Sequence, residues 1–259
     1  MHYGRTQTEK LINSMHFCRN FIHIFFILCL CSPAQGEIYK EEKDSGAGTL
    51  YGKIHFEGKV PQPKIFSIEK DKEICGKKER TIQEVPVTKG ALTNAIVYFP
   101  DIQKGKPFPS TDEKKTILQD KCFFKPHLLT VKQKSRISII SRDTVGHNIH
   151  AYEVHGTRRS TIFNLAQPTP DVKLEARVRV RRSQFVKVEC DLHKFMHSWI
   201  FVAKNPYYTA VQEDGTFNID GIPPGIHRIR VWNPLLGEKE KQVTVLPNGK
   251  EHLIFRFKE

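Results

Sequence analysis

Short hydrophobic runs recur along the chain from about residue 49 onward, and glycine, proline or other turn residues separate them. Within most runs, hydrophobic residues alternate with polar residues or are β-branched, as in a half-buried β-strand. The 3.6-residue period of a helix is nearly absent here. Fourteen such runs are more than one small sandwich needs. We therefore expect an all-β protein with strands at residues 49–56, 64–68, 95–99, 115–118, 128–131, 136–140, 148–154, 172–180, 185–189, 199–203, 216–219, 227–232, 241–245 and 251–257.

The first 36 residues follow a different pattern. Residues 21–30 form a short apolar run, with Arg19 before it and the small residues Ala34 and Gly36 after it. This layout is typical of a secretory signal peptide, and the run is shorter than the roughly 20 residues that span a bilayer. We expect residues 1–36 to be cleaved, with a retained anchor as the alternative, and the protein to be exported to the periplasm or the extracellular space without a stable membrane span. The polar residues 37–48 predict a flexible linker.

The chain is strongly basic, with 41 Lys and Arg against 28 Asp and Glu and a formal net charge of +13. Part of this charge is a dense run at Arg177, Arg179, Arg181 and Arg182. Nucleic acid is the usual partner of such a run, but export argues against it. Because valines alternate with these arginines, we expect a strand with one solvated basic face, or a docking patch for an acidic redox partner or an anionic surface.

The C-terminal part contains two turn motifs between predicted strands. Residues 213–219 read Glu-Asp-Gly-Thr-Phe-Asn-Ile, and residues 221–225 read Gly-Ile-Pro-Pro-Gly. The segment 205–259 resembles the carboxypeptidase regulatory-like, transthyretin-like sandwich, except that the opening strand of that module is missing from it. Residues 49–54, followed by Gly58 and Pro61, resemble this opening strand. We hypothesise that the N-terminal β segment, residues 49–114, completes the C-terminal sandwich, and that a second sandwich at residues 115–204 is inserted between its parts.

A cysteine, a histidine and a methionine follow the predicted strand at 185–189 at intervals of three residues. Alternation along the strand places Cys190 on the same face as Val188, at the inward side of the strand end. Because a tight loop can turn back over this end, the side chains of Cys190, His193 and Met196 can point at one centre. Such soft ligands suit copper, and two histidines, a cysteine and a weak axial methionine form an electron-transfer site.

This ligand set needs a second imidazole, which we expect from another strand. Residues 147–150 read His-Asn-Ile-His and offer two candidates, of which His147 is the predicted ligand and His150 the alternative. His150 could also complete a site with an open coordination position. The interpretation without a metal is a free buried thiol among unrelated histidines.

Two segments carry a resemblance to a known family. Residues 143–148, Asp-Thr-Val-Gly-His-Asn, resemble the histidine–asparagine loop of plastocyanin-like cupredoxins, and Cys190-x-x-His193 resembles their ligand loop. The resemblance implies a Greek-key β-sandwich over residues 115–204, with copper bound by His147, Cys190 and His193. It also implies that Asn148 ties the two ligand loops together.

The sequence departs from this family at the methionine. Only two residues separate His193 from Met196, fewer than in plastocyanin and azurin, and this interval resembles the dinuclear copper loop of cytochrome oxidase. Val186 stands where the second bridging cysteine of that loop would be, which favours a mononuclear site. Met196 is therefore either an axial ligand or a core side chain beside Phe195 and Trp199.

Cysteines outside the predicted signal peptide are Cys75, Cys122 and Cys190. An odd number in an oxidising compartment leaves one thiol free or bound to something else. We expect a disulfide between Cys75 and Cys122; the alternatives are an added metal ligand and unpaired buried thiols.

These observations favour a copper protein that transfers electrons to and from a redox partner protein. His193 would be the electron's exit if its ring edge is exposed, and lysines and arginines around that edge would steer an acidic partner. An electron carrier is favoured over an enzyme. No phosphate-binding glycine loop, Ser-His-Asp signature or zinc-finger spacing is present, which argues against nucleotide-dependent catalysis.

Three alternatives remain open. One is a copper enzyme or sensor with an open coordination position, and another is a copper carrier, although the chain has only 3 Met. The third is an extracellular module that binds carbohydrate or a cell-surface polymer through exposed Tyr207, Tyr208 and Trp232.

Overall fold

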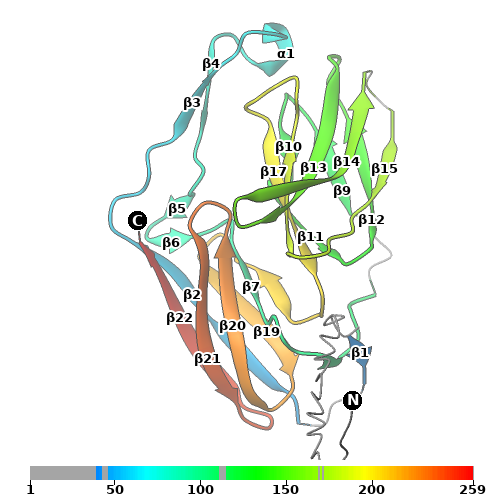
Figure 1. Cartoon of the computed structure of the whole chain (residues 1–259). Helices are drawn as coiled ribbons and strands as arrows, with labels where there is room; N and C mark the ends of the chain where they lie inside the picture. The colour runs from blue at the N-terminus through cyan, green and yellow to red at the C-terminus, as the bar shows by residue number, and fades with distance from the viewer. Residues whose placement is uncertain (1–38, 43–45, 111–114, 169, 171, 259) are drawn as a thin grey trace, which may run out of the picture. The chain divides into compact units, whose positions relative to one another are not determined.

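The computed structural model describes residues 39–42, 46–110, 115–168, 170 and 172–258 (Figure 1). The predicted signal peptide, residues 1–36, lies outside these ranges. The regular elements of the described residues are strands apart from one short helix, α1 (Lys72–Cys75), which confirms the all-β prediction. No helix in this part of the chain is long and apolar enough to cross a membrane.

The first sandwich is formed by the middle of the chain and contains the candidate site. One sheet has the order β10-β9-β12-β15, from the strands Phe124–Lys125, Thr116–Gln119, Arg136–Ser141 and Leu174–Arg177. The other has the order β11-β17-β16-β13-β14, from the strands Leu128–Lys132, His197–Ala203, Phe185–Glu189, His147–His155 and Arg158–Gln167.

The core of this sandwich follows from the alternation of its strands. In β16, Val186 and Val188 are fully buried while the other three residues are partly exposed. In β12, Ile137 and Ile139 are also fully buried, and they belong to the same hydrophobic cluster. Each strand thus supplies one apolar face to a shared core, which is how two stacked sheets are stabilised.

The second sandwich combines strands from both ends of the chain. Its sheets have the orders β18-β7-β20-β21 and β19-β2-β6-β5, with β22 paired to β2. The strands are β2 (Gly48–Glu57), β5 (Val87–Thr88), β6 (Ala91–Leu92), β7 (Ile96–Tyr98), β18 (Tyr208–Ala210), β19 (Thr216–Ile222), β20 (Gly225–Asn233), β21 (Gly237–Val245) and β22 (Lys250–Lys258).

Strand β2 holds this second sandwich together. It pairs with β19 in the antiparallel sense and with β22 in the parallel sense, so it lies between strands that follow the first sandwich in the sequence. Leu50 and Ile54 from β2 share a buried cluster with Phe217 of β19 and Phe255 of β22. The second sandwich is therefore discontinuous in sequence, because strands from before and after the first sandwich pair with one another.

An arm projects between β2 and β5 of the second sandwich. It is an antiparallel hairpin of β3 (Lys64–Ser67) and β4 (Glu79–Ile82), with α1 between the two strands (Figure 1). Ile68 and Cys75 of this arm are buried in the core cluster of the first sandwich. A short segment from outside the first sandwich therefore packs into the core of that sandwich, in the cluster that contains Cys190.

The expected linker at residues 37–48 does not hold for Lys40–Glu41, which form strand β1 and pair in parallel with β8 (Lys104–Gly105). The reason is the neighbouring Tyr39, whose hydroxyl donates to the Lys106 carbonyl at 2.7 Å. Its ring also lies edge-on to the rings of Phe108 and Tyr207. Aromatic burial thus anchors a segment that its composition predicts to be flexible.

Candidate metal centre

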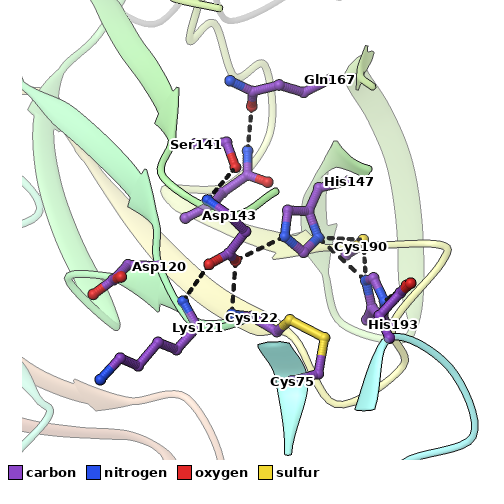
Figure 2. A network of polar contacts seen from close by, with 12 residues as sticks. Cys75, Asp120, Lys121, Cys122, Ser141, Asp143, His147, Gln167, Cys190 and His193 are labelled. Atoms are coloured by element: carbon purple, nitrogen blue, oxygen red, sulfur yellow. Dashed lines mark hydrogen bonds and ion pairs between the residues drawn. A yellow bond between two sulfur atoms is a disulfide. The ribbon is translucent and has the colours of Figure 1, made fainter. Parts of the chain in front are cut away.

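Three side-chain atoms converge at one end of the first sandwich. His147 Nδ1 and His193 Nδ1 are 3.2 Å apart, and Cys190 Sγ lies 3.9 Å from the first and 3.7 Å from the second. Exposed fractions are 2% for each histidine and 3% for Cys190. These atoms form a group that could hold one metal ion (Figure 2).

Strand register explains why residues 43 positions apart meet. β13 and β16 are antiparallel neighbours, with His150 opposite Glu189 and Val154 opposite Phe185. The start of β13 and the end of β16 therefore lie at the same edge of the sheet, where His147 begins one strand and Cys190 follows the other.

A tight loop brings His193 to the same point. The Cys190 N–H donates to the Met196 carbonyl at 3.2 Å, and the Met196 N–H donates to the His193 carbonyl at 2.8 Å. These bonds fold the loop back over the end of β16. Met196 is 1% exposed and belongs to the core cluster that includes Cys190 and Phe195.

Asn148 joins the two ligand segments. Its Oδ1 accepts from the Asp191 N–H at 2.6 Å, and its Nδ2 donates to Asp191 Oδ2 at 2.7 Å. A second bond from Nδ2 reaches Asn164 Oδ1 at 2.8 Å. Asp191 therefore fixes the loop and does not belong to the group of donor atoms around Cys190.

The other histidines near these loops point elsewhere. His150 stacks on Tyr152 at 3.9 Å and contacts Asp191 and Thr161, outside the three-atom group. His197 packs against the ring of His127 at 5.3 Å between centroids. Burial lowers the pKa of His127 to about 4, with the nearby His197 adding to the effect. His147 therefore supplies the imidazole from β13 that faces Cys190.

A buried carboxylate holds His147 from behind. Asp143 Oδ2 lies 2.8 Å from His147 Nε2, and Asp143 is 4% exposed. The same carboxylate accepts the N–H groups of Lys121 at 2.6 Å and Cys122 at 2.8 Å (Figure 2). A carboxylate that accepts the Nε2 proton would leave the lone pair of Nδ1 for a metal ion once Nδ1 carries no proton.

A second carboxylate faces His193. Asp71 Oδ2, from the arm, lies 2.8 Å from His193 Nε2 across 122 residues of sequence. His193 would be the electron's exit if its ring edge were exposed, but the side chain is 2% exposed. The condition is not met, because Asp71 of the arm covers this edge.

A disulfide attaches the arm to the first sandwich. It joins Cys75 of α1 to Cys122, so Cys122 is not a metal ligand and Cys190 is the free cysteine of the described residues. Arg80 adds a hydrogen bond from Nη1 to the Cys122 carbonyl at 2.5 Å and places its guanidinium over the ring of Phe123 at 3.9 Å. The arm is therefore fixed beside the donor atoms.

Hydrogen bonds prepare the thiol for metal binding. Burial raises the pKa of Cys190, but hydrogen bonds from His147 and His193 and from the N–H groups of Asn148 and Leu192 outweigh it and lower this pKa to about 6. The contact with Cys190 in turn raises the pKa of His193 against the effect of burial, and Asp71 adds to the rise. Because a metal binds the thiolate and the neutral imidazole, this site releases few protons from sulfur on loading.

The donor set fits copper. Two imidazole nitrogens and one thiolate, all buried, match the trigonal part of an electron-transfer copper site, and a buried thioether follows on the same loop. Each imidazole also has a carboxylate on its other nitrogen, the arrangement that orients metal-bound histidines.

Comparison with known proteins finds a likeness in structure. No protein-family model matches the chain, and no curated protein matches it in sequence. A purple cupredoxin from Nitrosopumilus maritimus aligns with 35% of this chain and 100% of its own, at 19% identity and a TM-score of 0.29. Reduced Cu(I) amicyanin with a proline-to-glycine mutation and Cu(I) amicyanin with a methionine-to-alanine mutation each align with 41% of this chain and 98% of theirs, at 19% and 17% identity and a TM-score of 0.29.

The aromatic residues of the binding-module alternative are buried or partly buried. Tyr207 is 0% exposed and Trp232 4% exposed. Tyr208 is partly buried, with its ring 5.7 Å from that of Phe201. These rings stabilise the core, and a carbohydrate could not stack on Tyr207 or Trp232 in this fold.

Proposed function

We propose that this protein transfers electrons through a single copper ion held by His147, Cys190 and His193, with Met196 as a weak axial ligand. The observation that carries the proposal is the buried convergence of the two Nδ1 atoms and Sγ within 3.9 Å of one another. When bound, copper would supply a one-electron couple between Cu(I) and Cu(II).

The protein's own residues keep the donor atoms still. Asp143 and Asp71 fix the two rings through their Nε2 atoms, and Asn148 fixes the loop through Asp191. A site whose ligands cannot move reorganises little when one electron arrives or leaves. Rigid ligands therefore favour electron transfer over the copper-carrier function, which requires the ligands to release the ion.

Burial argues against the enzyme or sensor alternative. The three donor residues are 2–3% exposed, which leaves little room for a substrate to reach them. The extra imidazole of His150, which could complete an open site, is instead held by Tyr152 and Asp191. An enzyme with an open coordination position would need to move these groups.

The redox partner would approach the covered edge of His193. Leu192 is 49% exposed beside it, and three exposed lysines adjoin residues of the site network in sequence: Lys72, Lys121 and Lys194. This combination of one apolar contact and several cations suits a protein partner with an acidic surface. Association should weaken as salt is raised.

Export remains part of the proposal. The signal-like pattern of residues 1–36 predicts it, and a disulfide such as Cys75–Cys122 persists in oxidising compartments. The second sandwich, whose turn motifs resemble the carboxypeptidase regulatory-like family, would serve as the scaffold from which the arm reaches the site.

Voltammetry of the copper-loaded exported protein tests this function. We expect a reversible one-electron wave that persists through repeated cycles, while the Cys190→Ser variant loses it. A Cu(I)-specific chelator should remove copper slowly from the reduced protein. Rapid loss of copper on reduction, without a reversible wave, would instead identify a carrier.

A further inference from the structure

A strongly basic cavity lies in the first sandwich. Its volume is about 430 Å³, and residues of β13, β14, β15 and the segment after β15 line it. The charge comes from five arginines: Arg158, Arg177, Arg179, Arg181 and Arg182.

Three of these arginines form a regular row. Val178 and Val180 are buried at 0% and 3% exposure, so the alternation turns Arg177, Arg179 and Arg181 to the exposed face. In an extended chain, side chains two positions apart are separated by about 6.6 Å. The cavity therefore presents cations at regular intervals along one direction.

The arginines of the cavity make no ion pairs with other described residues. Among the described residues, ion pairs of arginine are made by Arg159, Arg228, Arg230 and Arg256, and none by the five that line the cavity. Five arginines that share one cavity with a single carboxylate repel one another, so an anion that binds among them reduces this repulsion.

One acidic residue lines the cavity, but its carboxylate accepts hydrogen bonds from backbone N–H groups. Glu153 is 8% exposed, and its Oε1 accepts the N–H groups of Arg181 at 3.0 Å, Arg182 at 2.5 Å and Ser183 at 2.7 Å. These bonds hold the segment that carries Arg181 and Arg182 in one conformation. The row of cations is thus ordered before any ligand arrives, which lowers the entropy cost of binding.

The cavity is separate from the metal centre. His155, which lines it, is the last residue of β13, whereas His147 is the first. Eight residue steps of about 3.3 Å place these two positions about 26 Å apart, and Thr161, the lining residue opposite Tyr152, is still about 16 Å from His147 along the strand. A ligand of the cavity therefore does not contact the metal donors, and this basic surface is distinct from the proposed docking face for the redox partner.

We propose that the cavity binds a linear polyanion that carries sulfate or phosphate groups along its chain. The planar guanidinium fork donates two parallel hydrogen bonds to such oxyanions, and the hydroxyl of Ser160 in the lining can donate another. A row of evenly spaced cations in a hollow matches a charged chain better than the flat surface of a membrane.

Calorimetric titration of the copper-loaded exported protein tests this site. The probes are a heparin-derived sulfated oligosaccharide and inorganic polyphosphate of similar length, and the relative affinities tell a sulfated polymer from a phosphate polymer. The test variant is Arg179→Glu with Arg181→Glu. The control is Lys250→Glu with Lys258→Glu, which makes the same change in net charge on exposed residues of β22.

At physiological salt we expect at least one probe to bind wild type and control with similar affinity, and to bind the test variant at least tenfold more weakly. The absorption of the copper site should be the same in all three proteins. The proposal is overturned if neither probe binds, if test and control lose affinity equally, or if vesicles of anionic lipid bind at the arginines while both probes do not.

Discussion

Each imidazole of the candidate site has a carboxylate on the side of its ring that faces away from Cys190. Asp143 is buried behind His147, and Asp71 reaches His193 from the arm. A carboxylate that accepts the other ring N–H makes an imidazole a more basic ligand. Such ligands stabilise the more highly charged oxidation state of a bound metal, so both aspartates should lower the reduction potential.

Replacement of Asp71 by Asn removes this charge and keeps the shape of the side chain. Because Asp71 is 36% exposed and therefore screened, we expect an effect of about 1 kcal/mol, or a rise in reduction potential of roughly 40 mV for one electron. Voltammetry of Asp71→Asn beside Glu73→Gln, a control two residues further along the arm, checks this. Equal potentials in the two variants would contradict a role for Asp71 in tuning the site.

Glu153 stabilises the fold through three backbone N–H groups. We expect Glu153→Gln to lower the free energy of unfolding by about 2 kcal/mol at neutral pH. Burial raises the pKa of Glu153, but the N–H groups of Ser183, Arg182 and Arg181 outweigh it and hold this pKa below 4.5.

The stabilisation by Glu153 is therefore fully present above pH 4.5 and is lost as the pH falls through the lower pKa of the folded protein. Urea denaturation of wild type and Glu153→Gln at several pH values should show the two stabilities converging in acid. A difference that stays constant down to pH 3 would show that the charge of Glu153 is not responsible.

Local sequence identified the donor residues but not their supports. His147, Cys190 and His193 stand in short motifs at strand ends, where alternation and spacing indicate which atoms can meet. Asp71 has no such signal, because it lies 122 residues before His193 in the sequence, on the arm that connects two strands of the second sandwich. Asp143 was visible as part of the loop before His147, yet its bond to Nε2 depends on the fold.

At the scale of elements, the arm is the feature that sequence patterns could not reveal. β4 lacks clear alternation and α1 has only four residues, so neither was predicted. Strand β14 was missed for a related reason: it is an edge strand with most of its residues exposed, which leaves no apolar period to detect. Strands with one buried face, such as β2 and β16, were predicted close to their observed bounds.

The disulfide should determine how firmly the arm covers His193. In the chain-entropy model, a cross-link over 47 residues stabilises the fold by about 4 kcal/mol. We expect the double variant Cys75→Ala with Cys122→Ala to lose most of this stability and to exchange amide hydrogens faster at residues 68–80. Guanidinium denaturation measures the stability, and mass spectrometry measures the exchange. Unchanged exchange in the arm would show that Arg80 and packing suffice to hold it.

Strand β2 offers a test of the second sandwich. A Cβ added at Gly52 would lie 1.7 Å from the Leu253 carbonyl oxygen, so the backbones of β2 and β22 must separate. We expect Gly52→Ala to cost about 3 kcal/mol of stability, while Lys53→Ala at the next position changes little. Thermal unfolding of the two variants checks this, and equal melting temperatures would contradict the observed pairing.

At the scale of the whole molecule, the described chain keeps two chemistries apart. The donor atoms lie at the start of β13, and the arginine cavity lies at its other end. The second sandwich uses large aromatic residues in packing, as where Trp232 stacks on Phe185 at 4.3 Å. The two proposed functions, electron transfer and polyanion binding, therefore use separate ends of this strand.

The central claim is that Cys190 binds copper as a thiolate. Visible absorption and electron paramagnetic resonance of the Cu(II)-loaded protein should show intense thiolate-to-copper charge transfer in wild type and in the control His150→Gln, and none in Cys190→Ser. A stoichiometric copper signal without this charge transfer, unchanged in Cys190→Ser, would contradict the account.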